Sequence, residues 1–248
     1  MAAVVPAERA EAARALMIEL FPEGFEERDL ADGVELAAYT DAGGEERVWA
    51  AFSTVSSARV DDGWDKRWRD FHRPIEVGRL WVGPPWETPP AGLEAVVIDP
   101  GRAFGTGGHA TTRLCLELLL ELQPSSLVDV GCGSGVIAIA AARLGFAPVL
   151  AVDHDPAALE ATSRNALANG VELELSSADA LVGALPPVDV IVANISESSI
   201  RQLRPDAATG AVIASGYLES ERPALAGFDA VERRVLQGWA ADLFRRAE

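Results

Sequence analysis

Cysteine, histidine and lysine are scarce in this chain. Its 248 residues include 2 cysteines, 3 histidines and a single lysine, Lys66. Cys115 and Cys132 both sit in apolar stretches, and such pairs are more often buried thiols than a disulfide in a reducing compartment. With so few sulfur and imidazole ligands, and those few scattered, we expect no metal site.

Long apolar runs are missing too. None approaches the roughly 20 residues that a membrane-spanning helix needs. The first 14 residues carry Glu8, Arg9, Glu11 and Arg14 among alanines, which is unlike a secretion signal. We therefore expect a cytoplasmic protein that has no membrane partner. We also expect it to be a monomer.

Positive charge is in deficit, with 21 basic against 38 acidic residues and a net charge of −17. Nucleic-acid backbones are bound through Lys and Arg that displace counterions, so direct nucleic-acid binding is not expected. A basic protein is a more natural partner. The alternative is that the charge serves solubility alone.

The first part of the chain, residues 1–58, reads as a small α+β domain. Periodicity predicts a helix over Ala7–Leu20, with Ala12, Ala15, Leu16 and Leu20 on one side. Three strands are expected after it, at Phe25–Arg28, Val34–Tyr39 and Arg47–Phe52, with turns at Asp32-Gly33 and Gly43-Gly44.

Residues 59–75 have the character of a linker helix. Trp64, Trp68 and Phe71 are spaced i, i+4 and i+7, which places them on one helix face. Docking of this face on a domain is the simpler interpretation, and direct contact with a substrate is the alternative.

Residues 76–248 alternate apolar runs with helical patterns, which predicts an α/β domain with a doubly wound, mainly parallel sheet covered on both faces. Two short strands are expected first, at Leu80–Trp86 and Ala95–Pro100. The sheet strands are expected at Leu127–Val130, Val149–Asp153, Val171–Leu175, Val188–Val192 and Ala211–Ser215. Two final strands should meet near Gln237-Gly238, within Ala230–Arg246.

A glycine-rich turn follows the first sheet strand. Gly131, Gly133 and Gly135 are spaced Gly-x-Gly-x-Gly at a strand-to-helix junction, where doubly wound folds bind ligands. Dinucleotide sites use Gly-x-Gly-x-x-Gly, so this shorter spacing favours a nucleoside. A structural turn is the alternative.

Asp153 ends the next strand, where a carboxylate can accept hydrogen bonds from the hydroxyls of a ribose. Asp155 is expected instead to cap a helix that begins at Pro156.

Two further polar residues follow later strands. Asp179 could accept from an adenine amino group, or could be a solvated loop acid. Asn194 offers both donors and an acceptor at the expected position of the transferable group. Asn194 could instead cap the helix expected over Ser196–Leu203.

The segment from Asp99 to Thr112 is the most unusual. Gly105, Gly107 and Gly108 describe a loop able to bend around a ligand before a helix over Arg113–Leu122. Thr106 and Gly107 are candidate cofactor contacts, and Phe104 and His109 are candidate catalytic residues. His109 could instead only start the helix.

These motifs resemble the PrmA family of bacterial methyltransferases, which modify large ribosomal subunit protein eleven. The family pattern Gly-Thr-Gly-x-His-x-Thr-Thr is met by Gly105 to Thr112, and the other matches are Gly131 to Gly135, Asp153, Val192 to Asn194 and the series Trp64, Trp68, Phe71, Pro74. The resemblance implies a class I fold, S-adenosylmethionine as cofactor, and Thr112, Gly131, Asp153 and Asn194 as cofactor contacts.

By this resemblance, the reaction is N-methylation of lysine side-chain and/or N-terminal amines of a ribosomal protein. The resemblance also implies that residues 1–58 are the substrate-recognition domain and residues 76–248 the catalytic domain. An enzyme of the same fold acting on another protein or a small amine is one alternative. A cofactor-binding module without activity is another, and a nicotinamide oxidoreductase is disfavoured by the glycine spacing. Because Ile195-Ser196 follows Asn194, the Asn-Pro-Pro-Tyr signature of many nucleic-acid amine methyltransferases is absent, which disfavours nucleobase methylation.

Overall fold

The structure is a computed structural model of the whole chain. It describes residues 1–6, 9–10, 13, 16–17, 20–21, 26–30, 33–38, 40, 42–52, 54–57, 73–99, 108–183 and 185–247. The chain divides into two compact units, Met1–Trp68 and Arg69–Glu248. Trp64, Trp68 and Phe71 of the predicted linker helix lie outside the described residues. The predicted end of that helix is wrong, because Ile75 begins a strand.

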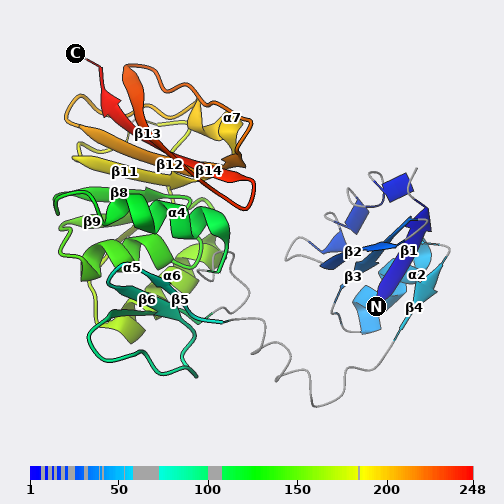
Figure 1. Cartoon of the computed structure of the whole chain (residues 1–248). Coiled ribbons are helices and arrows are strands. Elements are labelled where there is room, and N and C mark those ends of the chain that lie inside the picture. Colours follow the sequence, from blue (N-terminus) through cyan, green and yellow to red (C-terminus); the bar gives the residue numbers. More distant parts are fainter. Residues whose placement is uncertain are drawn as a thin grey trace. The chain divides into compact units, whose positions relative to one another are not determined.

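The smaller unit contains a four-stranded antiparallel sheet in the order β2-β3-β1-β4 (Figure 1). The strands are β1 (Ala2–Pro6), β2 (Glu26–Leu30), β3 (Gly33–Ala37) and β4 (Val55–Ser56), and the helix is α2 (Ala42–Ala51). The described residues among 10–20 are helical, as predicted. Strands β1 and β4 were not expected from the sequence. Ala3, Met17, Phe21, Leu36 and Val48 are among the buried residues of this unit's core.

The strand predicted over Arg47–Phe52 is wrong, because residues 47–51 belong to α2. Gly44, Val48 and Phe52 are buried, and their spacing of four places them on one side of a helix. Gly43-Gly44 therefore lies within the helix and does not form the predicted turn. A short apolar run does not distinguish strand from helix by itself.

The larger unit is built on a seven-stranded sheet in the order β10-β9-β8-β11-β12-β14-β13. Its strands are β8 (Leu127–Val130), β9 (Val149–Val152), β10 (Glu174–Ser176), β11 (Val190–Asn194), β12 (Ala211–Leu218), β13 (Phe228–Leu236) and β14 (Trp239–Arg246). Neighbours are parallel from β10 to β12, and β14 is antiparallel to β12 and β13. The predicted mainly parallel sheet and the final strand pair are confirmed.

Alternate residues of the central strands pack into two separate cores, so both faces of the sheet are covered. Leu127 and Ile213 pack with the first core, to which α4 (Ala110–Leu119) and α5 (Val136–Arg143) contribute. Val128 and Val212 pack with the second, together with Ile200 of α7 (Glu197–Ile200). Figure 1 shows α4 and α5 on one side of the strands and α7 on the other. This is the predicted doubly wound α/β arrangement.

Helix α6 (Pro156–Asn169) packs beside α5 and against a small sheet of three strands. These strands are β5 (Ile75–Val77), β6 (Leu80–Gly83) and β7 (Glu94–Val97). Between β10 and β11, the described residues form turns where a helix was expected.

Cys115 and Cys132 are buried free thiols, as predicted. Within the described part of the chain, no helix is long and apolar enough to cross a bilayer.

Candidate functional site

The glycine-rich turn connects β8 to α5 at the carboxyl end of the sheet. Gly131, Gly133 and Gly135 have φ values of +72°, +54° and +82°, a region that favours glycine. The amide of Gly131 donates to the carbonyl of Val152 over 2.8 Å, which ties the turn to β9. A Cβ on Gly131 would lie 2.7 Å from Ile195 Cγ2. The turn therefore needs glycine both for its backbone and for its packing.

Asp153 lies directly beside this turn. Its Oδ2 accepts from the amide of Gly133 and its Oδ1 from the amide of Asp155, each over 3.0 Å. Only 10% of the side chain is exposed. Asp155 caps α6 by accepting from the amide of Ala157, as predicted. The backbone thus fixes a carboxylate next to the glycine turn, with further lone pairs on its oxygens.

Asn194 ends β11 at the same edge of the sheet and is half-buried. The residue before it pairs with Val130, and Asn194 itself pairs with Ser215. Ser196 caps α7, so the alternative that Asn194 caps this helix is wrong. A Cβ on Gly216 would lie 2.3 Å from the carbonyl oxygen of Ile195, and Gly216 has a φ of +100°. This close approach holds the segment that follows Asn194.

His109 is the N-cap of α4, so the helix begins at Ala110, one turn before the predicted start. Its Nδ1 accepts from the amide of Thr111 over 3.3 Å, and its ring meets Trp239 edge-on at 4.9 Å. Burial lowers the pKa of His109. The helix-start interpretation is confirmed, and a catalytic role stays a prediction.

Of the remaining predicted site residues, the structure describes two and leaves three outside the described residues. Thr112 is buried in the first turn of α4. Asp179 is exposed, and its Oδ1 accepts from the amide of Leu181 over 2.9 Å, which fits a loop acid that orders its own turn. Phe104, Thr106 and Gly107 lie outside the described residues.

Asp129, which the sequence analysis did not single out, is a buried carboxylate under the glycine turn. Its Oδ2 accepts from the amide of Ala138 over 3.1 Å. The N-cap residue Gly135 has no side chain to cap α5, so Asp129 performs this capping. Burial raises the pKa of Asp129 to about 7, and the charge of Asp153 adds to the effect. An acid inside an apolar strand was the signal in the sequence.

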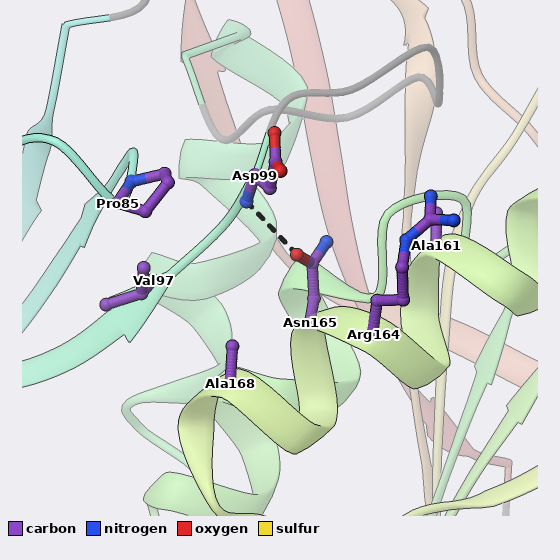
Figure 2. Close-up of a pocket in the computed structure, with 7 residues that line it drawn as sticks. All are labelled: Pro85, Val97, Asp99, Ala161, Arg164, Asn165 and Ala168. Carbon is purple, nitrogen blue, oxygen red and sulfur yellow. Dashed lines mark hydrogen bonds between the residues drawn. The ribbon is translucent and has the colours of Figure 1, made fainter.

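Helix α6 supplies three buried polar side chains that sequence reasoning also missed. Thr162 Oγ1 donates to the carbonyl of Gly133 over 3.0 Å, and Asn165 Nδ2 donates to that of Ser134 over 2.9 Å. Asn169 bonds to β7. Thr162, Asn165 and Asn169 are spaced like the apolar stripe of a helix, which was the available signal. Figure 2 shows Asn165 in a pocket with Asp99 and Arg164.

Together these residues can accommodate a nucleoside. The glycine turn lacks the side chains that would keep a ligand from the backbone, and Asp153 supplies a carboxylate suited to a pair of hydroxyls. No group of three or more metal-ligating side chains is found among the described residues. The arrangement thus fits S-adenosylmethionine at the glycine turn.

Comparison with known proteins agrees with this geometry. The ribosomal protein L11 methyltransferase of Symbiobacterium thermophilum is 43% identical over 199 residues, or 74% of this chain and 66% of that protein. The enzyme of that name from Legionella pneumophila is 40% identical over 205 residues, or 75% of this chain and 69% of that protein. The chain thus matches about two thirds of the length of these relatives.

A solved structure is also similar to this chain. The crystal structure of ribosomal protein L11 methylase from Lactobacillus delbrueckii subsp. bulgaricus matches with a TM-score of 0.64 and 31% identity, covering 71% of this chain and 100% of that one. The family model for ribosomal protein L11 methyltransferase (PrmA) matches residues 7–245, nearly the whole chain. The chain therefore belongs to the ribosomal protein L11 methyltransferase (PrmA) family.

Proposed function

We propose that this chain transfers methyl groups from S-adenosylmethionine to amines of ribosomal protein L11, on lysine side chains and/or the N-terminus. The observation that carries this proposal is the pairing of Asp153 with the amide of Gly133 beside a positive-φ glycine turn, in a chain whose family match spans residues 7–245. The names of the relatives support L11 as the substrate.

The residues that would hold the cofactor lie at one edge of the sheet. Asp153 would accept from the ribose hydroxyls, and the backbone of Gly131, Gly133 and Gly135 would contact the nucleoside. Asp179 would accept from the adenine amino group through its second carboxylate oxygen. Thr112 and, from the segment outside the described residues, Thr106 and Gly107 complete the proposed set. When bound, the sulfonium cofactor supplies a methyl group that is already electrophilic.

The task of the protein is then to present a neutral amine in line with the methyl group. Orientation of the reacting atoms supplies much of the rate in such reactions. A lysine with an ordinary pKa near 10.4 is protonated at pH 7, which costs about 4–5 kcal/mol to reverse. Desolvation favours the neutral amine. We assign Asn194 to orient the amine. Phe104 and His109 remain further candidates for a catalytic role.

The charge of the chain suits a basic protein substrate. Residues 1–68 contain 15 acidic and 7 basic residues, and residues 69–248 contain 23 acidic and 14 basic residues. Both units are therefore acidic, which favours the approach of a basic partner. We assign substrate recognition to the smaller unit, which has its own core, and we place the reaction in the cytoplasm.

The direct test is mass spectrometry of purified ribosomal protein L11 after incubation with this protein and S-adenosylmethionine. We expect mass increments of one or more methyl groups on lysine or the terminal amine. Asn194→Ala should lower the rate about 100-fold, the size of effect that misplacement of a reacting group produces. Gln202→Ala, an exposed change after α7, should leave the rate unchanged.

The outcomes distinguish the alternatives. No increment on L11, together with intact cofactor binding, would move the substrate to another protein or a small amine. No increment on any amine, again with cofactor bound, would favour a binding module without activity. Undiminished turnover by Asn194→Ala would remove Asn194 from the proposed mechanism.

A further inference from the structure

Three polar side chains of α6 point into the protein. Thr162, Asn165 and Asn169 are 0%, 3% and 4% exposed. An amide buried without hydrogen bonds is costly, so the partners of these groups show what holds them in place. Asn169 donates one bond within α6, to the carbonyl of Asn165. The other partners lie in two separate segments, the end of β7 with Asp99 and the glycine turn.

The first segment is the free edge of β7. Asn169 accepts from the amide of Val97 over 2.8 Å and donates to the carbonyl of the same residue over 2.6 Å. Asn165 Oδ1 accepts from the amide of Asp99 over 3.1 Å. The amide of Ile98, between them, donates in the other direction to Gly83 of β6. The two asparagines therefore take the place of a neighbouring strand.

The spacing explains why two side chains on a helix can do this. Asn165 and Asn169 are four residues apart, a rise of about 6 Å along a helix. Val97 and Asp99 are two residues apart, a rise of about 6.6 Å along a strand. The two repeats match, so each asparagine meets one outward-facing residue of the strand end.

The second segment is the glycine turn. Asn165 Nδ2 donates to the carbonyl of Ser134 over 2.9 Å. The same amide group therefore bonds to the turn through its nitrogen and to Asp99 through its oxygen. Figure 2 shows the bond to Asp99 and the position of Asn165 next to the end of β7. Asp99 is followed in the chain by the segment that contains Gly105 to Thr112.

We propose that Asn165 is a positioning residue that couples the glycine turn to the end of β7, so that binding at the turn changes the stability of the strand end before Gly105–Thr112. The proposal rests on the proposed function, in which the glycine turn holds the cofactor. Asn165 acts through the two backbones that it joins and needs no contact with the cofactor itself. Asn169, which bonds to β7 but to no part of the glycine turn, lacks this coupling role.

The test combines two measurements on the full chain, with S-adenosylhomocysteine as the ligand. Calorimetry gives the dissociation constant, and hydrogen exchange gives the protection of residues 94–99 with and without ligand. In the unchanged protein, ligand should slow exchange in this peptide. Asn165→Ala should raise the dissociation constant about fivefold to tenfold, as the loss of a hydrogen bond that orders the turn would, and should abolish the effect of ligand on the peptide.

Two more variants separate coupling from general stability. Asn165→Asp keeps an acceptor for the amide of Asp99 but removes the donor to Ser134, so it should behave like Asn165→Ala toward the ligand while largely retaining the basal protection. Asn169→Ala should speed basal exchange of residues 94–99, yet leave the dissociation constant within twofold and preserve the effect of ligand.

Wild-type affinity together with wild-type ligand protection in Asn165→Ala and Asn165→Asp would overturn the proposal. Equal loss of the ligand effect in Asn169→Ala would also overturn it, because the asparagines would then act only by holding β7. Failure of the unchanged protein to bind S-adenosylhomocysteine would instead contradict the proposed function, so the two failures are distinguishable.

Discussion

Two carboxylates are buried in the seven-stranded sheet of the larger unit, and their surroundings differ. Asp242 of β14 is 3% exposed and receives two bonds from Arg233, each over 2.8 Å, and a third from the hydroxyl of Tyr217 over 2.8 Å. Asp129 of β8 is 1% exposed and accepts from the amide of Ala138. Within the described part of the chain, no ion pair involves Asp129.

The difference shows what the surroundings of each carboxylate are suited to. At β14, the guanidinium of Arg233 balances the carboxylate of Asp242. Burial raises the pKa of Tyr217, and the negative charge of Asp242 raises it further. At β8, the charge is balanced only by the amino end of a helix, and the pKa of Asp129 rises to about 7. The group around Asp242 is thus a closed network that stabilises the fold. Asp129, in contrast, is a carboxylate that titrates near neutral pH beside the proposed site of a cationic cofactor.

The largest effect should come from breaking the closed network. Asp242→Ala leaves Arg233 without its carboxylate partner, and removal of one member of a buried pair costs about 3–5 kcal/mol. Because 19% of the Arg233 side chain is exposed, we expect a value near the lower limit. Denaturant unfolding measures the free energy of unfolding. Glu160→Ala, which breaks an exposed pair with Arg164, should cost less than about 1 kcal/mol, and an equally small cost for Asp242→Ala would refute the comparison.

An effect of similar size, but dependent on pH, is expected at Asp129. Folding raises the pKa of this carboxyl, so its contribution to stability is fully present below pH 4 and is lost as pH rises through about 7. Asp129→Asn cannot titrate and keeps an acceptor oxygen for Ala138. The stability of the original protein relative to Asp129→Asn should therefore fall by about 2–4 kcal/mol between pH 4 and pH 7.

The measurement for Asp129 is the free energy of unfolding at several pH values for both proteins. Asp189 provides a control of opposite sign, because hydrogen bonds from Ser126 lower the pKa of this exposed carboxyl. The stability that Asp189 contributes should be lost as pH falls, and Asp189→Asn should remove that loss. A difference between the original protein and Asp129→Asn that does not change with pH would show that folding does not raise the pKa of Asp129.

The sequence predicted the larger unit better than the smaller one, and the reasons are physical. The strands around Asp129 and Asn194 are continuous apolar runs buried on both faces, a pattern that leaves few alternatives. The Arg47–Phe52 run is short, and its apolar residues fit the period of a strand as well as that of a helix. Its prediction as a strand was therefore wrong. The positions of Gly131, Asp153 and Asn194 at one edge followed from parallel topology.

What the sequence could not show was the set of bonds that fix these residues. Asn165 has the helical spacing of an apolar position, but its partners, Asp99 and Ser134, are 66 and 31 residues away in the chain. The pairing of Arg233 with Asp242 likewise depends on the register of a hairpin. Such contacts follow from the folded arrangement and leave little trace in local patterns.

The smallest effect is expected at His109, whose pKa burial also shifts. Its pKa is lowered, so its contribution to stability is present above pH 6.5 and is lost as pH falls below that value. Protonation would also remove the Nδ1 acceptor that caps α4. His109→Ala should cost about 1 kcal/mol, the usual cost of losing an N-cap.

His109→Asn separates capping from chemistry, because asparagine is a good N-cap that cannot act as a proton acceptor near pH 7. If His109 only starts the helix, this variant should restore both stability and the rate of methylation. If His109 takes part in the reaction, stability should return while the rate stays low and loses the pH dependence of an imidazole. Full activity in His109→Asn would exclude an imidazole from the reaction. Asp129 would then be the buried group near the site that titrates close to neutral pH, whereas Asp242 is held in an ion pair with Arg233.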